Sequence, residues 1–168
     1  MITRPILTFL IAFIACASLG GPALAQQADA QLRALYEADW TWSLTEYEQQ
    51  EDGEGGIEPT AHLPRVDSAN QERRAAHTRE TLAALNRIPL DALSEAERIN
   101  AEVFRTNLEN ALTDARFREW EMPVNSDSAF WQYLDQRQGF RTAEEYRRYI
   151  GRMREIPRFF AENIVSPA

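Results

Sequence analysis

Residues 141–164, RTAEEYRRYIGRMREIPRFFAENI, form the clearest helical pattern in the sequence. Apolar side chains recur there every three or four positions, a spacing that places them along one face of an α-helix. They are Tyr146, Tyr149, Ile150, Met153, Pro157, Phe160 and Ile164. An apolar stripe of this length needs a partner surface, which either the preceding residues or residues outside this chain must supply.

The ends and the polar side of this helix are also readable. Thr142 and Glu145 have the spacing of a capping box, in which each side chain accepts a hydrogen bond from the other residue's backbone N–H. Pro157 has no N–H for the carbonyl of Met153 and its ring crowds that carbonyl, so we expect a kink there. Five arginines lie mostly off the stripe and should meet solvent or acidic neighbours. They are Arg147, Arg148, Arg152, Arg154 and Arg158.

The composition is that of an ordinary globular protein with an acidic balance. The 168 residues are 44% hydrophobic and 26% charged, which is enough for one domain with a core. The net charge is −8, and all 18 basic residues are arginine. Because a phosphate backbone must be met by clustered positive charge, this balance argues against nucleic-acid binding.

The N-terminus has the pattern of a secretory signal peptide, residues 1–25. Arg4 supplies its positive start, residues 6–17 are apolar, and residues 23–25, ALA, give the small-x-small cleavage site. We expect cleavage after Ala25 and a destination in the periplasm or outside a bacterial cell. Residues 26–168 then form the mature region.

Two alternatives to a cleaved signal are weaker. An uncleaved membrane anchor is disfavoured because the apolar run is shorter than the ~20 residues that span a bilayer, so no stable span is expected in the mature protein. Lipidation at Cys16 is the second alternative, with Phe13 standing where leucine is usual. Cys16 is the only cysteine, so the mature chain would contain no disulfide.

The residue pattern in the rest of the sequence predicts further helices and no strand. Helical periodicity covers residues 28–50, 68–88 and 94–116. Ser94 and Glu97 have the spacing of a second capping box, and the short connection between the last two of these helices favours an antiparallel hairpin. Residues 51–67 are predicted to form an acidic loop. Residues 117–140 are predicted to form a loop around Pro123, with a short helix at 128–136. The fold class predicted is all-α, an antiparallel helical bundle.

No complete catalytic or metal-binding motif occurs in the sequence. His62 and His77 have no second histidine at zinc-ligand spacing, and we interpret both as surface or packing residues. There is no cysteine nucleophile in the mature region and no nucleophile elbow or phosphate-binding loop. Trp40 and Trp42 are interpreted as core packing, with a wall of a substrate cleft as the alternative.

Five stretches together resemble the N-terminal part of the bacterial domain of unknown function 885 family. They are LRALYEADWTWSLTEYE, LPRVD, LAALNRIPLDALSEAERINAEVFRTNLENAL, EWEMPVN and FRTAEEYRRYIGRMREIPRFFAENI, in this order over most of residues 30–165. They are helix-packing patterns rather than catalytic signatures, and their ordered series carries the resemblance. Members of that family are exported proteins, several times longer than this chain.

The resemblance implies an all-helical, zincin-like fold and a zinc-dependent peptidase activity in a longer parent protein. The family's H-E-x-x-H helix lies far downstream, so no catalytic residue or metal ligand carries over to any position here, and this chain alone is expected to be inactive and to hold no cofactor. Residues 26–168 are then the N-terminal helical region of an incomplete domain, and a peptide substrate would reach it through the parent. By the same likeness, the residues expected to line a cleft are Trp40, Trp42, Trp120 and Asn125.

A second hypothesis belongs to another class. The same helix stripes and acidic surface fit a self-contained periplasmic helical bundle that binds a partner protein. A complete bundle should unfold in one sharp transition, whereas a region that lacks its partner surface should expose apolar area and bind a hydrophobic dye.

Overall fold

The described part of the chain is mainly α-helical, as predicted. The computed structural model describes residues 20–122 and 139–164, with side chains from residue 25 onward. Its helices are α1 (Gly20–Glu46), α2 (Ser68–Leu85), α3 (Glu95–Arg116) and α4 (Ala143–Ile164). Two short 3-10 helices, η1 (Leu90–Ala92) and η2 (Glu119–Glu121), and two strands, β1 (Gln49–Glu51) and β2 (Ile57–Pro59), complete the described elements.

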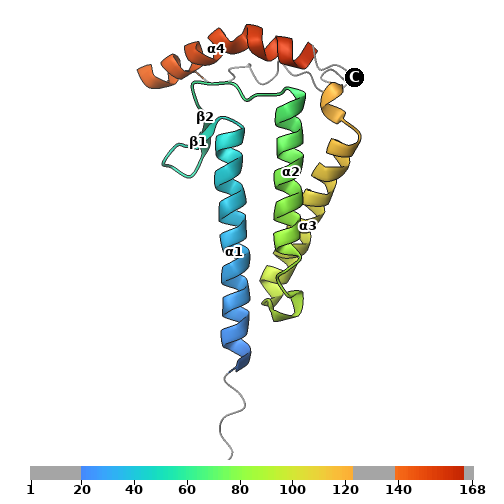
Figure 1. Ribbon diagram of the computed structural model, residues 1–168. Coiled ribbons are helices and arrows are strands. Elements are labelled where there is room, and N and C mark those ends of the chain that lie inside the picture. Colours follow the sequence, from blue (N-terminus) through green and yellow to red (C-terminus); the bar gives the residue numbers. More distant parts are fainter. Residues whose placement is uncertain (1–19, 123–138, 165–168) are drawn as a thin grey trace, which may run out of the picture.

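The first three helices form an antiparallel bundle, and the fourth lies across one end of it. Figure 1 shows α1, α2 and α3 side by side with alternating direction, and α4 running crosswise above the end where α1 finishes and α2 begins. The predicted bundle is therefore present in α1–α3. The predicted stripe helix is not a member of that bundle.

The apolar core sits between the three helices, toward the turn that joins α2 to α3. Its largest fully buried side chains are Leu32 of α1 and Leu85 of α2. The other members of the core cluster are Ala28, Ile88, Leu93, Ala101 and Leu108. Tyr36 packs edge-on against Phe104 beside this cluster, with 4.9 Å between the ring centroids. Burial of this kind is the main favourable term in the folding of the domain.

The second predicted capping box is only half formed. The Ser94 hydroxyl accepts from the backbone N–H of Glu97 at 3.4 Å and caps α3 as expected. The Glu97 carboxylate does not return to Ser94 but accepts from the Arg33 side chain of α1 at 2.7 Å. The backbone N–H of Ser94 instead donates to Asp29 of α1 at 3.0 Å. Contacts between α1 and α3 have thus replaced one of the two hydrogen bonds of the capping box.

The predicted first loop contains a strand hairpin, which corrects the expectation of no strand and of a first helix that reaches residue 50. α1 ends at Glu46, and Glu48 takes a left-handed conformation, with φ of 53°, that turns the chain. β1 then pairs antiparallel with β2, with Gln50 opposite Glu58. Strands of three residues are too short to show the alternation by which a sequence indicates them.

Asp52 closes the turn of this hairpin. Its carboxylate accepts from the backbone N–H groups of Glu54 and Gly56, both at 2.8 Å. These hydrogen bonds lower the pKa of Asp52 below its ordinary value. Gly53 and Gly55 have φ of 80° and 88°, a region that side chains with a Cβ rarely adopt. The glycines that suggested a loop are therefore the turn of a hairpin.

α2 starts where the sequence predicted and ends three residues earlier. The Asp67 side chain caps it by accepting from the backbone N–H of Asn70 at 3.1 Å. α2 stops at Leu85, and the N–H groups of Arg87 and Ile88 bond to carbonyls three residues back. Pro89 disfavours the helical conformation of the residue before it, so the chain tightens into a turn ahead of it.

α4 begins with the predicted cap. The Thr142 hydroxyl accepts from the N–H of Glu145 at 3.1 Å, and the Glu145 carboxylate accepts from the N–H of Arg141 at 2.7 Å, one residue ahead of the position predicted. Pro157 lies inside the helix, which continues to Ile164. Figure 1 shows α4 as a gently arched helix.

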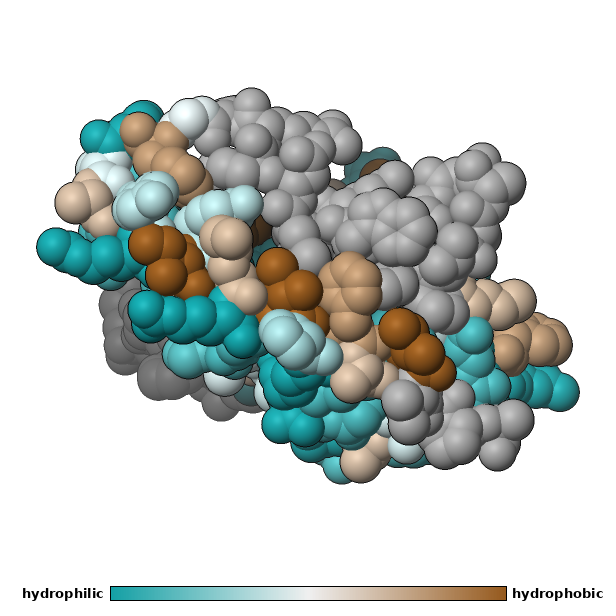
Figure 2. All heavy atoms as spheres, turned by 90° about the horizontal axis from the view of Figure 1, so that it is seen from above, coloured by the Kyte–Doolittle hydropathy of each residue, from teal (hydrophilic) through white to brown (hydrophobic). Residues whose placement is uncertain are grey.

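Part of the apolar stripe of α4 is exposed, while Tyr149, Ile150 and Phe160 of the same stripe are half-buried. Tyr146, Met153 and Ile164 are 53%, 48% and 70% exposed, whereas Phe159, which lies off the predicted stripe, is 2% exposed. Figure 2, which looks down on α4, shows hydrophobic residues spaced along this outer surface. Among the described residues, Phe140 is the aromatic neighbour of the stripe, with its ring 5.2 Å from that of Tyr146.

Truncation of the core should separate buried from exposed positions. Leu85→Ala removes a side chain that is 0% exposed and should lower the free energy of unfolding by about 2–5 kcal/mol, measured by urea unfolding. Ile99→Ala, at a position that is 58% exposed on α3, is the matched control and should change it by no more than about 0.5 kcal/mol. Equal effects of the two substitutions would contradict the packing described above.

Candidate functional site

A small cleft lies where α4 meets the hairpin. Its volume is about 130 Å³, and it is lined by the two strands, by residues 47–48 and 62–64, and by Arg152 of α4. Clefts that hold small molecules are typically ~300–1,000 Å³, so this one is a niche between elements rather than a full ligand pocket.

The carboxylates of the cleft already serve the structure. Glu58 accepts from Arg148 of α4 at 2.6 Å and from Gln50 of the facing strand at 2.7 Å. Glu48 accepts from the Thr60 hydroxyl at 2.9 Å. The polar groups of the cleft therefore join the hairpin to α4 and to the segment that follows the hairpin.

Two glutamates of α4 hold the segment of residues 61–66 against that helix. The Glu155 carboxylate accepts from His62 Nδ1 at 2.6 Å and from the backbone N–H of Leu63 at 2.9 Å. The Glu162 carboxylate accepts from the backbone N–H of Val66 at 3.0 Å and forms an ion pair with the Arg65 side chain at 2.6 Å. Backbone N–H groups that no strand or helix satisfies thus find charged acceptors.

Arg158 lies between these two glutamates and completes the cluster. It donates to Glu155 at 2.7 Å and to Glu162 at 2.9 Å, which are its neighbours three and four positions away on the helix. It also donates to the carbonyl of Leu63 at 2.7 Å. We call these residues, His62, Glu155, Arg158 and Glu162, the α4 clasp.

The clasp shifts the pKa values of its members. Burial alone would raise the pKa of Glu155, but hydrogen bonds from His62, Leu63 and Arg158 outweigh it and hold that pKa at about 2. The hydrogen bond to Glu155 raises the pKa of His62 above its ordinary value. Glu155 therefore stays ionised down to strongly acidic pH. At higher pH, the charge of the clasp changes when His62 gains or loses its proton.

A second polar cluster joins the upper halves of α1 and α2. Glu46 of α1 is buried and forms ion pairs with Arg73 and Arg74 of α2, the latter at 2.8 Å. About two turns earlier on α1, an Asp39 oxygen lies 2.8 Å from His77 Nε2 of α2. Such contacts fix the alignment of the two helices where apolar packing is sparse.

The cleft-lining residues that the sequence suggested have separate environments. Trp40 is 45% exposed and donates from its ring nitrogen to Glu51 of β1 at 3.1 Å. Trp42 stacks on His77 of α2, with ring centroids 3.6 Å apart. Trp120 lies half-buried in η2, and its buried ring nitrogen has no acceptor among the described residues. Asn125 falls outside the described residues.

None of the three described tryptophans lines the cleft beside the hairpin. Their proposed role as cleft walls stays a prediction. The clasp was not predicted from the sequence, although part of its signal was present. Glu155, Arg158 and Glu162 have the i, i+3 and i, i+4 spacings of helix ion pairs, but the partner segment of residues 61–66 has no pattern that assigns it to them.

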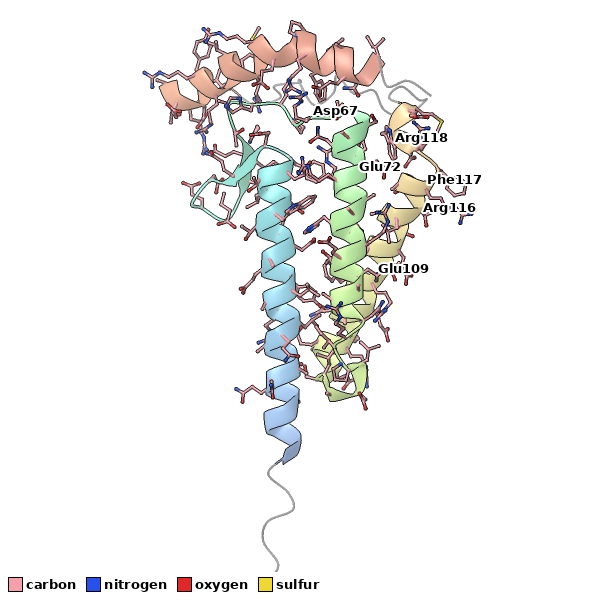
Figure 3. The ribbon with its side chains drawn as sticks, viewed as in Figure 1. Asp67, Glu72, Glu109, Arg116, Phe117 and Arg118 are labelled. Atoms are coloured by element: carbon pink, nitrogen blue, oxygen red, sulfur yellow. The ribbon has the colours of Figure 1, made fainter. Side chains whose placement is uncertain are left out.

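Figure 3 labels residues of α2 and α3, among them several where α2 begins and α3 ends. Asp67 lies at the start of α2, and Arg116 lies in the last turn of α3. A negative charge at the start of α2 and a positive charge at the end of α3 complement the dipoles of the two helices. Arg118 takes a left-handed conformation, with φ of 52°, that ends the α3 segment, and Phe117 beside it is 70% exposed.

In the part of the chain that the structure describes, no group of three or more histidine, cysteine, aspartate or glutamate side chains is arranged to hold a metal ion. No helix of residues 20–122 and 139–164 is long and apolar enough to cross a membrane.

Comparison with known protein families assigns the chain to one of them. A family model described as bacterial protein of unknown function (DUF885) matches residues 50–166. The chain belongs to this family. The match covers the hairpin, α2, α3 and α4, and begins after α1, whereas the resemblance in the sequence extended back to residue 30. Neither the curated proteins nor the solved structures contain a significant match.

Removal of the Glu46 charge should destabilise the bundle. Glu46→Gln leaves Arg74, whose side chain is 11% exposed, without its anionic partner. We expect a loss of about 2–3 kcal/mol in urea unfolding, less than for a fully buried pair because Arg73 is half-exposed. Glu72→Gln is the control, because the Glu72 side chain is 68% exposed and its pair with Arg79 is 3.9 Å long. A loss no larger than that of the control would contradict the assigned role of Glu46.

Gly151 marks the closest approach of α4 to the segment beneath it. A Cβ at this position would lie 2.5 Å from the carbonyl oxygen of Ala61. Alanine normally favours a helix over glycine by ~1 kcal/mol, so Gly151→Ala would stabilise a free helix. Here we expect Gly151→Ala to destabilise α4 and to make amide hydrogen exchange faster throughout that helix. Arg154→Ala, at an exposed position, is the control and should leave exchange unchanged. Slower exchange in Gly151→Ala would show that α4 is not seated on Ala61.

Proposed function

We propose that this chain is the N-terminal helical portion of an exported hydrolase that resembles zinc-dependent peptidases, with the catalytic motif outside these residues. The observation that carries the proposal is the orientation of α4. Its polar side is occupied by the clasp, while Tyr146, Met153 and Ile164 of its apolar stripe face outward. An apolar stripe of this kind on one helix is the usual mark of a surface that packs against further protein.

Membership of the DUF885 family is consistent with this proposal, and the resemblance supplies its chemistry. The family resemblance implies a downstream H-E-x-x-H helix that would bind zinc, whose bound water would act as the nucleophile with the glutamate as general base. The described residues would then support and roof the substrate cleft. Trp40, Trp42, Trp120 and Asn125 remain the proposed lining.

Export is part of the same proposal. The pattern of residues 1–25 supports a signal peptide with cleavage after Ala25, which falls within the second turn of α1. Mature α1 would then begin close to Ala28, the first residue of the core cluster, so cleavage leaves the core intact. N-terminal sequencing of the exported protein checks this: Gln26 is expected as the first residue, and Met1 would contradict it.

A substitution on the stripe tests the proposal directly. Met153→Glu places a charge on the outer surface of α4, where the side chain is 48% exposed. In residues 26–168 alone it should change the free energy of unfolding by no more than about 0.5 kcal/mol. In the product of a reading frame that continues beyond codon 168, it should lower stability by about 2 kcal/mol or more, because a charge would be buried.

Arg154→Glu, at an exposed neighbouring position, is the control and should be neutral in both chains. The longer product is expected to contain H-E-x-x-H, to bind one zinc and to hydrolyse peptides. Stoichiometric zinc in residues 26–168 would overturn the proposal. A genuine stop after codon 168, together with a sharp melting transition and no dye binding, would overturn it in favour of the stand-alone interaction domain.

A further inference from the structure

α4 makes a dense set of polar contacts with one short segment of the described chain. That segment, residues 58–66, supplies the partners of Glu155, Arg158 and Glu162 outside α4 described above, and also supplies Glu58, which pairs with Arg148 at 2.6 Å. Phe159 is the buried apolar residue of α4. Charges and hydrogen bonds therefore contribute to the attachment of α4 beside the burial of Phe159.

We propose that His62 and Glu155 form a pH-dependent latch that sets how firmly α4 is held against the bundle. The geometry points to this role because His62 Nδ1 lies 2.6 Å from Glu155 Oε1, while the other Glu155 oxygen accepts from Leu63, the next residue in the chain. Protonated His62 and ionised Glu155 thus bind the segment to α4 as an ion pair. This inference concerns the attachment of α4 and does not depend on the activity proposed above.

The charges around His62 favour its protonated form. Glu155 is its direct partner, and Glu48, two residues after the end of α1, adds a second negative charge. Arg158 of α4 opposes them. Arg152 and Glu58 line the same cleft, with opposite signs. The side chain of His62 is 62% exposed, so protons exchange freely with solvent and the latch responds to bulk pH.

The direction of the response follows from the two pKa shifts. The raised pKa of His62 means that its contribution is full below the ordinary value of 6.5 and is lost as pH rises through the higher value in the folded chain. Glu155 contributes fully above its ordinary value of 4.5 and loses its contribution as pH falls toward about 2. The latch is therefore tightest between these two ordinary values and loosens in mildly alkaline solution.

Amide hydrogen exchange of the full chain at pH 5.5 and 8.5, corrected for intrinsic rates, tests the latch. Exchange in α4 should be about two- to fivefold faster at the higher pH, the range of a solvent-exposed ion pair, while exchange in α3 stays the same. His62→Gln should remove this pH dependence. His77→Gln, which alters the only other histidine, should leave it in place.

A direct titration keeps the test independent of folding effects in the variants. Proton NMR of the two imidazoles in the unaltered chain should give a pKa for His62 above 6.5, and Glu155→Gln should lower it. No pH dependence in α4, its persistence in His62→Gln, or a His62 pKa at or below 6.5 would each overturn the latch.

Discussion

The acceptance of backbone N–H groups by Glu155 and Glu162 is the interaction on which the arrangement of this molecule depends. The segment of residues 61–66 has no regular secondary structure, so its N–H and C=O groups need partners from elsewhere. The polar side of α4 supplies them, through two carboxylates and Arg158. Because the polar side of α4 binds residues 61–66, the apolar stripe on the opposite side of the helix points away from that segment.

This constraint reverses the usual orientation of an amphipathic helix. In most small domains the stripe turns inward because burial of apolar area is the larger favourable term. In this chain the bundle of α1–α3 closes its own core around Leu32 and Leu85, toward the end far from α4. α4 is therefore held by its polar side, while Tyr146, Met153 and Ile164 of its stripe are exposed. The same feature connects the proposed role as part of a larger enzyme with the latch at His62.

Much of the fold was predictable from the sequence because it depends on local signals. Ser94 and Thr142 mark helix starts that the structure confirms, and α2 begins at residue 68 as predicted. The hairpin was missed because its strands are three residues long and its turn residues, such as Gly53, are equally typical of a loop. The clasp was missed because it joins residues more than 90 positions apart, and no local pattern pairs His62 with Glu155. The site predictions at Trp40 and Trp42 identified exposed or half-buried aromatic residues, but their directions depend on tertiary contacts with β1 and α2.

The central claim is that α4 is seated by its polar side with its stripe outward. Residues 26–168 contain no cysteine, so single cysteines can be introduced without competing thiols. The most direct measurement is the rate of thiol labelling in Met153→Cys and Phe159→Cys, compared with each chain unfolded in urea. Labelling at position 153 is expected to be close to the unfolded rate. Labelling at position 159 is expected to be slower by an order of magnitude or more, because the native side chain there is 2% exposed. Slow labelling at position 153 with fast labelling at position 159 would contradict it, because α4 would then be seated on its stripe.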